Sequence, residues 1–460
     1  MSENERFDLA VIGTGGAAFS AAIRAHELGA ERIALIERQT LGGTCVNVGC
    51  VPSKALLAAA AQHHRGLHHP FAGIPHAESE VGLAALRSQK DHLVAEMRQG
   101  KYLDLAHLYG FELIEGNARF SSPDSLDVDG RAIKAARFIV ATGAEPAVPD
   151  IEGIETVEFL TSTTAMELDE VPEHLIVVGA GFVGLEQAQL FRRLGAKVTL
   201  VGRFAPQAEP ELSEALASIF EQEGIRLIPE RVARVEGDSG VRVSTSSGAT
   251  VRGSHLLVAV GRSPRTRDLA LHDAGVELNA RGAIVTDEHQ RTSSPDIYAA
   301  GDVTADHQFV YLAAAQGAVA AENAIADQGT SVDLAGLPEV VFTDPQLASA
   351  GLTEAESQSR GIQTDSRVLP LDKVPRAVVE HDTRGAIKVV ADTATRQVLG
   401  VHALSPGAGD LILAATYAIK NQMTVEELAH TWAPYLTHAE GVRLAARSFD
   451  HDIERLSCCA

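Results

Sequence analysis

The chain has 460 residues, of which 45% are apolar, and its 39 basic and 61 acidic side chains give a net charge of −22. A chain of this length exceeds one hydrophobic core and is expected to form about three domains. The acidic balance argues against nucleic acid and anionic membrane as partners. No unbroken apolar run approaches the ~20 residues that span a bilayer, and the N-terminus lacks a signal-peptide pattern. We therefore expect a cytoplasmic protein without membrane insertion.

The N-terminal region is expected to form a nucleotide-binding unit of strand, glycine-rich turn, helix and strand. The strands are expected over 7–12 and 32–36, with a helix over 18–28 between them. Glycines in such a turn let a phosphate approach the backbone at the positive end of the helix. Glu37 directly follows the second strand, where a carboxylate accepts a hydrogen bond from a ribose 2′-OH. The turn residues expected to contact the nucleotide are Gly13, Gly15, Gly16, Ala17 and Ala18.

Cys45 and Cys50 follow this unit in the run G-G-T-C-V-N-V-G-C-V-P-S-K, with a spacing typical of a redox pair. An unperturbed thiol with a pKa of about 8.5 is roughly 3% thiolate at pH 7. A helix N-terminus and nearby Lys54 would raise that fraction. The alternative, two core cysteines without a function, fits poorly with a glycine-rich setting flanked by proline.

A second strand–turn–helix–strand unit is expected over 174–203. One G-x-G-x-x-G motif is a weak signal, but two copies, each between a strand and a helix, indicate two nucleotide sites. The position that corresponds to Glu37 is Gly202, and Arg203 follows it. A missing carboxylate beside a guanidinium favours a 2′-phosphate, and therefore NADPH over NADH. The glycines expected to contact this nucleotide are Gly179, Gly181 and Gly184.

The remaining elements complete an α/β chain with two Rossmann-like nucleotide-binding domains and an α+β C-terminal domain. Buried strands ending in small residues are expected over 138–143, 256–261 and 297–302. After residue 338 the pattern changes to strands near 387–390 and 398–403 and helices over 409–421, 425–430 and 439–449. The expected domains are 1–148 with 263–333, then 149–262, then 334–460.

Two further clusters contain residue types that can bind metals, but only the first has a pattern that favours it. Cys458 and Cys459 are adjacent, and neighbouring Cα atoms lie ~3.8 Å apart, whereas an unstrained disulfide usually needs ~4.4–6.8 Å. Two such thiols on a chain end suit a soft metal ion better. The histidine-rich stretch 62–76 has no Cys or carboxylate at ligand spacing and is expected to be solvated.

The run 42–54 resembles the active-site signature of the flavin disulfide-reductase family. The resemblance extends over essentially the whole chain through the two nucleotide units, the A-T-G and A-G-D turns and the C-terminal helices. It implies FAD in the first nucleotide domain, with Cys50 beside the flavin and Cys45 as the exchanging thiol. Lys54 and Glu186 would form an ion pair near the flavin, and Asp302 would hold the ribityl chain. Further cofactor contacts are implied at Thr44, Lys54, Ala118, Ala141, Thr142, Gly143, Val310 and Gly261.

The C-terminal region departs from the disulfide-reducing members of that family, which carry a His five residues before a Glu. Glu440 fits this pattern, but Tyr435 holds the His position. Tyrosine, with a pKa of about 10, is a poor proton shuttle at neutral pH. His438 is no obvious substitute, because residues two apart on a helix do not share a face. Tyr435 and the ending L-S-C-C-A are similar to the mercuric reductases of the family.

The similarity to mercuric reductases implies a homodimer that uses NADPH and FAD to reduce thiol-bound Hg(II) to Hg(0). Cys458 and Cys459 of one subunit would collect the metal and pass it to Cys45 and Cys50 of the other. Many mercuric reductases have a Tyr where this chain has Phe159, and many begin with a small metal-binding domain that we do not expect here. Hg(II) would then arrive on small thiols or another protein.

Two alternatives remain open from the sequence. A disulfide reductase resembling dihydrolipoamide dehydrogenase is one, and Tyr435 argues against it. A thiol protein that sequesters metal without catalysis is the other, and two nucleotide-binding units argue against it.

Overall fold

The computed structural model describes residues 6–77, 80–238, 240–304 and 307–453. Cys458 and Cys459 lie outside the described residues. The chain divides into two compact units. Unit 1 comprises Met1–Ala55, Ala84–Ala147 and Gly261–Asp333, and unit 2 comprises Leu56–Leu83, Val148–Val260 and Leu334–Ala460. The division into three domains expected from the sequence stays a prediction.

Unit 1 is built on a seven-stranded sheet in the order β3-β2-β1-β6-β5-β4, with β16 paired to β6. The pairs among β3, β2, β1, β6 and β16 are parallel, and β4 and β5 extend the sheet as an antiparallel hairpin. The strands are β1 (Arg6–Ile12), β2 (Ile33–Glu37), β3 (Glu112–Glu115), β4 (Ala118–Ser122), β5 (Ser125–Val128), β6 (Arg131–Val140) and β16 (Ile297–Ala299). A two-stranded ladder joins β7 (Ala144–Pro146) to β15 (Arg262–Pro264).

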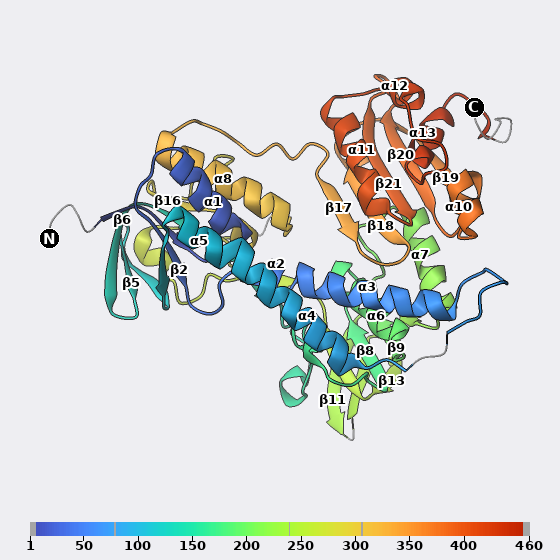
Figure 1. Cartoon of the computed structure of the whole chain (residues 1–460), viewed down its shortest axis with the longest axis horizontal. Helices are drawn as coiled ribbons and strands as arrows, with labels where there is room; N and C mark the ends of the chain where they lie inside the picture. Colours follow the sequence, from blue (N-terminus) through green and yellow to red (C-terminus); the bar gives the residue numbers. More distant parts are fainter. Residues whose placement is uncertain (1–5, 78–79, 239, 305–306, 454–460) are drawn as a thin grey trace. The chain divides into compact units, whose positions relative to one another are not determined.

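Two helices of unit 1, α1 (Gly16–Glu27) and α8 (Val310–Ala326), lie side by side (Figure 1). Their backbones approach closely, since a Cβ added at Gly317 would lie 2.1 Å from the Ala17 carbonyl oxygen. Strand β2 and the second half of β1 are almost continuously apolar and buried, as expected for a parallel sheet. This packing holds the N-terminus of α1 at the ends of the central strands.

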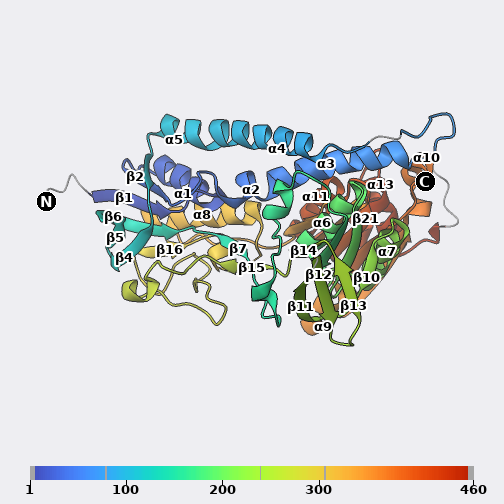
Figure 2. The ribbon, with the colours of Figure 1, turned by 90° about the horizontal axis from the view of Figure 1, so that it is seen from below.

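Further helices contain the redox cysteines or follow them in the chain. They are α2 (Gly43–Asn47), α3 (Cys50–Leu67), α4 (Leu83–Arg98), the π-helix η2 (Gln99–Leu103) and α5 (Asp104–Tyr109). Helices α4 and α5 run in line through η2 (Figure 2). By length and mean hydropathy alone, Gly43–Leu67 is apolar enough to cross a membrane, with 28% of its apolar window buried. Polar residues such as Asn47, Ser53 and Lys54 interrupt this stretch, so it contains no unbroken apolar run of spanning length. Length and composition are weak support for a span, since core helices pass the same test.

Unit 2 contains three sheets. The parallel sheet has the order β10-β9-β8-β14, the small antiparallel sheet β11-β12-β13, and the five-stranded antiparallel sheet β17-β18-β21-β20-β19. The strands of the first two are β8 (His174–Val178), β9 (Lys197–Val201), β10 (Arg226–Ile228), β11 (Val232–Asp238), β12 (Gly240–Thr245), β13 (Thr250–Gly253) and β14 (His255–Val258). Those of the third are β17 (Pro338–Val341), β18 (Gln346–Gly351), β19 (Thr364–Pro370), β20 (Ala386–Asp392) and β21 (Val398–Ser405).

Helices cover these sheets. They are α6 (Phe182–Arg193), α7 (Pro210–Gln222), α9 (Glu354–Ser359), α10 (Pro375–Glu380), α11 (Ala408–Lys420), α12 (Val425–His430) and α13 (Glu440–Arg447). Residues of α11 and α13 share one apolar core with the five-stranded sheet, which they cover in Figure 1. The expected α/β class, with two Rossmann-like halves and an α+β C-terminal part, is confirmed.

Most expected elements have boundaries within a few residues of those observed, but β6 begins at Arg131, seven residues before the expected start at 138. Helix α12 begins and ends where expected, whereas the first helix begins at Gly16 rather than at residue 18. The hairpin β4–β5, the sheet β11-β12-β13 and strand β19 were not expected. These strands are short and amphipathic, so tertiary pairing rather than a strong local pattern defines them.

Candidate active site

The parallel sheet of unit 1 reverses its strand order between β1 and β6, because β2 and β3 lie on one side of β1 and β6 and β16 on the other. Ligands of open α/β sheets bind at such a switch point, at the carboxyl ends of the strands. Gly13 follows β1 there with φ +113°, and a Cβ at this position would lie 2.3 Å from the Ala141 carbonyl oxygen. Glycine is therefore required where the predicted turn meets the A-T-G turn.

The residues around this switch point fit a dinucleotide such as FAD. No side chain among the described residues caps the N-terminus of α1, so its first N–H groups can bind a pyrophosphate. A Cβ added at Gly15 would meet nothing nearer than the Gly43 Cα at 3.7 Å. The Glu37 carboxylate stands beside the turn, where it accepts hydrogen bonds from the Thr14 hydroxyl and, at 2.9 Å, from the Gln39 N–H.

Other predicted flavin contacts lie in unit 1 as well. Val310 begins α8, and its Cγ2 would be 3.1 Å from a Cβ at Gly16. The Thr142 hydroxyl donates to the Arg265 carbonyl at 2.6 Å. Ala118 begins β4 inside an apolar core of the unit. The rest are Thr44 in α2, Gly143 after β6, Gly261 after β14, and Asp302 after β16.

Cys45 and Cys50 are free thiols in two successive helices, Cys45 in the middle of the short helix α2 and Cys50 as the first residue of α3. The pKa of Cys45 is raised, first by the hydrogen bond that it shares with Cys50 and then by burial. The proton of the reduced pair therefore stays on Cys45, and the negative charge falls on Cys50. The positive end of α3 favours a thiolate at that position.

Two residues that no sequence motif indicated, Tyr102 and Arg262, interact with this pair. Burial raises the pKa of Tyr102, and the charges of Cys45 and Cys50 add to the effect. Arg262 interacts electrostatically with Cys50 and lies 3.8 Å from Asp302. Burial also raises the pKa of Asp302. Arg262 directly follows a predicted strand and could have been suspected, whereas Tyr102 lies on the π-helix, where no motif marks it.

The parallel sheet of unit 2 repeats this construction between β8 and β14. Gly179 has φ +103°, and its added Cβ would lie 2.3 Å from the Ala259 carbonyl oxygen. A Cβ at Gly184 would lie 1.8 Å from the Gly179 oxygen, whereas one at Gly181 would meet no atom within 4 Å. The N-terminus of α6, like that of α1, has no side-chain cap among the described residues. A second pyrophosphate therefore fits here.

Arg203 follows β9, and its guanidinium donates to the Pro206 carbonyl at 3.0 Å. Gly202 has φ +142°, and a Cβ there would lie 3.4 Å from the Ala180 nitrogen. The backbone thus gives a second reason for the missing carboxylate at this position. The preference for NADPH therefore depends more on the Arg203 guanidinium than on the absence of an acid.

Glu186 is 6% exposed in α6 and accepts the Phe342 N–H at 3.0 Å, so it is not a solvated helix residue. Lys54 belongs to unit 1, and the predicted pair of Lys54 with Glu186 stays a prediction. Tyr435 is 48% exposed, whereas Glu440, at the start of α13, is 4% exposed. The Nε2 of His438 donates to the Glu380 carboxylate at 2.9 Å, and its Nδ1 lies 3.3 Å from the Ser405 hydroxyl, so both ring nitrogens are engaged.

The histidine-rich stretch forms the end of α3 and the loop after it. The rings of His64 and His68 are 4.6 Å apart, and those of His69 and His76 stack at 4.5 Å. Among the described residues, no group of three or more His, Cys, Asp or Glu side chains is arranged to hold a metal ion. In the described part of the chain, Cys45 and Cys50 offer two soft ligands to a metal that arrives as substrate.

Two family models cover nearly the whole described chain. Residues 7–326 match the pyridine nucleotide-disulphide oxidoreductase model, and residues 337–446 match the dimerisation domain of the same enzymes. The chain belongs to the pyridine nucleotide-disulphide oxidoreductase family. The dimerisation domain indicates a homodimer, and Leu413, Tyr417 and Trp432 expose apolar surface on that domain.

Curated relatives in this family are named mercuric reductases. The chain is 48% identical to the one from Streptomyces lividans, over 99% of this chain and 98% of the relative. It is 46% identical to the one from Bacillus cereus, over 99% of this chain and 74% of the relative.

Solved structures of the family show the same fold. The HOCl-induced flavoprotein disulfide reductase RclA from Escherichia coli has a TM-score of 0.86 at 29% identity, over 96% of this chain and 99% of that one. LpdA from Mycobacterium tuberculosis also has a TM-score of 0.86 at 29% identity, over 96% of this chain and all of that one (100%).

Proposed function

We propose that this chain is a mercuric reductase, an FAD- and NADPH-dependent enzyme that reduces thiol-bound Hg(II) to Hg(0) and so detoxifies mercury. The observation that carries the proposal is a thiol pair, Cys45 and Cys50, in a chain with Tyr435 in place of the acid–base histidine. Its full-length identity of 41–48% with mercuric reductases supports the same reaction.

The reaction balances as NADPH and Hg(II) giving NADP⁺, H⁺ and Hg(0). When bound, FAD passes the two electrons of the nicotinamide hydride to the thiol–metal centre. Gly13, Gly15 and Glu37 would hold FAD, while Gly181 and Arg203 would hold NADPH. The two thiols of Cys45 and Cys50 bind the soft metal as thiolates, so metal binding releases the proton that Cys45 retains in the reduced pair.

A metal ion can move between thiolates without a general acid or base, whereas reduction of a disulfide must deliver protons to two leaving sulfurs. The exposed phenol of Tyr435 cannot supply that proton efficiently at neutral pH. His438 is already engaged by Glu380 and Ser405. These observations favour the metal over a disulfide as substrate.

The test is oxidation of NADPH by the purified holoenzyme with Hg(II) and excess small thiol, together with loss of volatile mercury from solution. We expect both to proceed with Hg(II). Rapid oxidation of NADPH by lipoamide or glutathione disulfide without metal would instead identify a disulfide reductase. Binding of Hg(II) without NADPH oxidation would identify a sequestering protein.

We also propose that FAD binds within 1–148 and 263–333, NADPH within 149–262, and that 334–460 forms the dimer. The active site would be shared across the interface, with Tyr435 and Glu440 of one subunit beside the thiol pair of the other. Dimer formation would cover the apolar surface of the dimerisation domain. A cytoplasmic location stays a prediction.

Cys458 and Cys459, outside the described residues, would hand Hg(II) to the thiol pair of the other subunit. A mixed dimer tests this crossing: one subunit lacks Cys45 and Cys50, and the other lacks Cys458 and Cys459. We expect this mixed dimer to reduce Hg(II) bound to a bulky dithiol, because the remaining tail reaches the remaining pair across the interface. An inactive mixed dimer, with a wild-type dimer assembled in the same way as the active control, would place the transfer within one subunit.

A further inference from the structure

The loop that carries Arg203 is fixed to the nucleotide turn of unit 2 at its near end. The Ala205 N–H donates to the Ala180 carbonyl at 3.0 Å, inside the Gly179–Gly184 turn. The Arg203 guanidinium braces the same loop through the Pro206 carbonyl at 3.0 Å. The position of this guanidinium therefore depends on the conformation of the whole segment up to helix α7.

The far end of this loop is Glu209, whose backbone begins α7 while its side chain enters the C-terminal sheet. Glu209 is 2% exposed, and one of its oxygens accepts the Glu354 N–H at 2.7 Å. The other oxygen accepts from the Nζ of Lys388, on β20, at 3.0 Å. Glu209 thus lies six positions after Arg203 in the chain and is anchored to Lys388 of the dimerisation domain.

Lys388 is fully buried and holds three carboxylates at once. Its Nζ donates to Glu354 at 2.6 Å and to Glu211 at 3.0 Å, in addition to Glu209. Burial alone would lower the pKa of Lys388, but these hydrogen bonds raise it above its ordinary value. The ammonium therefore stays charged and the anchor intact over the whole physiological range of pH.

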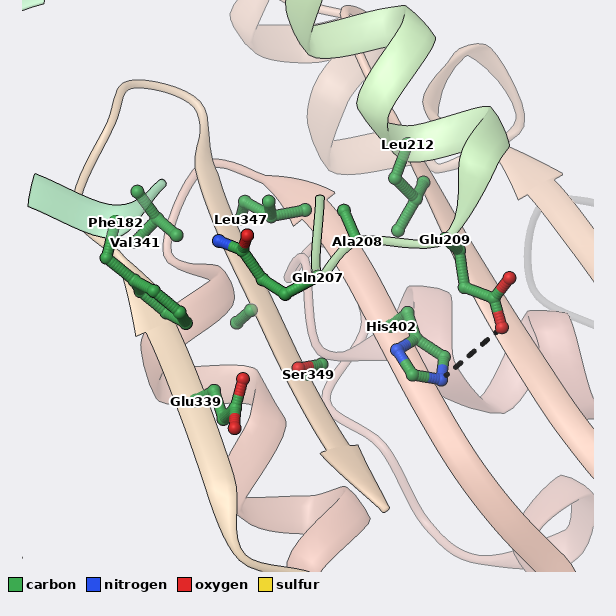
Figure 3. Close-up of a pocket in the computed structure, with 11 residues that line it drawn as sticks. Phe182, Gln207, Ala208, Glu209, Leu212, Glu339, Val341, Leu347, Ser349 and His402 are labelled. Carbon is green, nitrogen blue, oxygen red and sulfur yellow. Dashed lines mark ion pairs between the residues drawn. The ribbon is translucent and has the colours of Figure 1, made fainter. Parts of the chain in front are cut away.

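The seam between the loop and the sheet is incompletely filled. A pocket runs along it, with Gln207, Glu209 and Leu212 on one wall and residues of β17, β18 and β21 on the other (Figure 3). The amide nitrogen of Gln207 is buried here and has no hydrogen-bond partner in the described chain. The imidazole of His402 lies 3.9 Å from Glu209 and is committed to the Leu352 carbonyl at 3.1 Å. Phe204 packs against Phe220, with ring centroids 5.4 Å apart, near the start of the loop, and the ion cluster holds its far end.

We propose that Glu209 and Lys388 are positioning residues for NADPH, which hold the Arg203 guanidinium where it meets the 2′-phosphate. The inference rests on the NADPH dependence of the proposed function. It goes beyond it by placing part of the cofactor selectivity in the dimerisation domain, on a residue that does not touch the nucleotide motif. Loss of the anchor weakens recognition of the 2′-phosphate and leaves hydride transfer intact.

The experiment is anaerobic reduction of the bound flavin of the holoenzyme by NADPH and by NADH, without mercury. Glu209→Gln keeps the shape of the side chain, and Lys388 keeps two other carboxylates. We expect the NADPH concentration for half-maximal reduction to rise about tenfold, as is usual when supporting contacts of a binding site are lost. The maximal rate with NADPH and both parameters with NADH should stay within about twofold, because NADH has no 2′-phosphate.

Glu223→Gln is the matched control. Glu223 caps the other end of α7 and forms an equally buried pair with Arg193, 2.7 Å away. Glu223→Gln should lower the melting temperature without changing the ratio of the NADPH and NADH concentrations needed for half-maximal flavin reduction. If Glu209→Gln behaves in the same way as this control, or weakens both nucleotides equally, Glu209 is a structural residue and the proposal is wrong.

A double-mutant cycle identifies the route of the effect. In an Arg203→Ala background, Glu209→Gln should cost little further affinity for NADPH, because both changes remove the same interaction. Additive losses would contradict positioning through Arg203. A failure of the proposed function would look different, since equal use of NADPH and NADH by the unmutated enzyme would be seen before any variant is made.

Discussion

Replacing Cys50 by serine is expected to abolish Hg(II)-dependent NADPH oxidation and the long-wavelength absorption that a thiolate gives beside flavin. The raised pKa of Cys45 places the negative charge of the reduced pair on Cys50. A serine hydroxyl stays neutral at this position. Neither the thiolate–flavin absorption nor a bond between the metal and the sulfur of residue 50 can then form. We expect kcat to fall by about 10³-fold or more, as when an enzyme loses its reacting nucleophile. Anaerobic reduction by NADPH, followed by absorbance, measures the first effect, and release of Hg(0) measures the second.

Variants of Cys45 separate the two thiols. Cys45→Ser should keep the absorption band, because a hydroxyl still donates a hydrogen bond to the Cys50 thiolate. Cys45→Ala removes the donor, so the pH at which the band is half developed should move upward. Both variants should lose Hg(II) reduction, because one thiolate of the pair is gone. A band that survives Cys50→Ser and disappears in Cys45→Ser would show that the two roles are reversed.

The glycine-rich turns and the cysteine pair could be predicted because their causes are local. A glycine at Gly13 or Gly179 is required by positive φ and by a carbonyl that leaves no room for a Cβ. The spacing of the motif, its place between a strand and a helix and its repetition in the chain express these requirements in sequence. The same holds for Cys50 at a helix N-terminus, which follows from the residues around it.

The supporting residues could not be predicted in this way. Glu209 and Lys388 are 179 positions apart and meet through tertiary packing, with no shared motif. Tyr102 interacts electrostatically with the thiol pair from a π-helix in a segment with no sequence signature. Charged residues such as Glu209 and Lys388 are usually solvated. Their burial is therefore visible in the structure and not in the composition of the segments that carry them.

Gly184→Ala is expected to damage unit 2, whereas Gly181→Ala should affect nucleotide binding without disturbing the fold. The Cβ of an alanine at position 184 would lie 1.8 Å from the Gly179 carbonyl oxygen and 2.8 Å from its carbon. Both atoms belong to the backbone, so helix α6 must move away from β8, at a cost of about 1–3 kcal/mol or more. Unit 1 carries Ala18 at the corresponding position, so the two turns are not interchangeable.

Gly181 is the matched control from the same turn. Its φ of −89° suits alanine, and a Cβ there would meet no atom of the protein within 4 Å. We therefore expect an unfolding free energy within about 0.5 kcal/mol of wild type, but the methyl group would occupy the space into which the pyrophosphate of NADPH must come. The NADPH concentration for half-maximal flavin reduction should rise at least about tenfold. Calorimetry and anaerobic NADPH titration separate the two effects. Normal NADPH binding by Gly181→Ala would show that the pyrophosphate does not approach this turn, and an unchanged melting temperature for Gly184→Ala would contradict the close helix–strand contact.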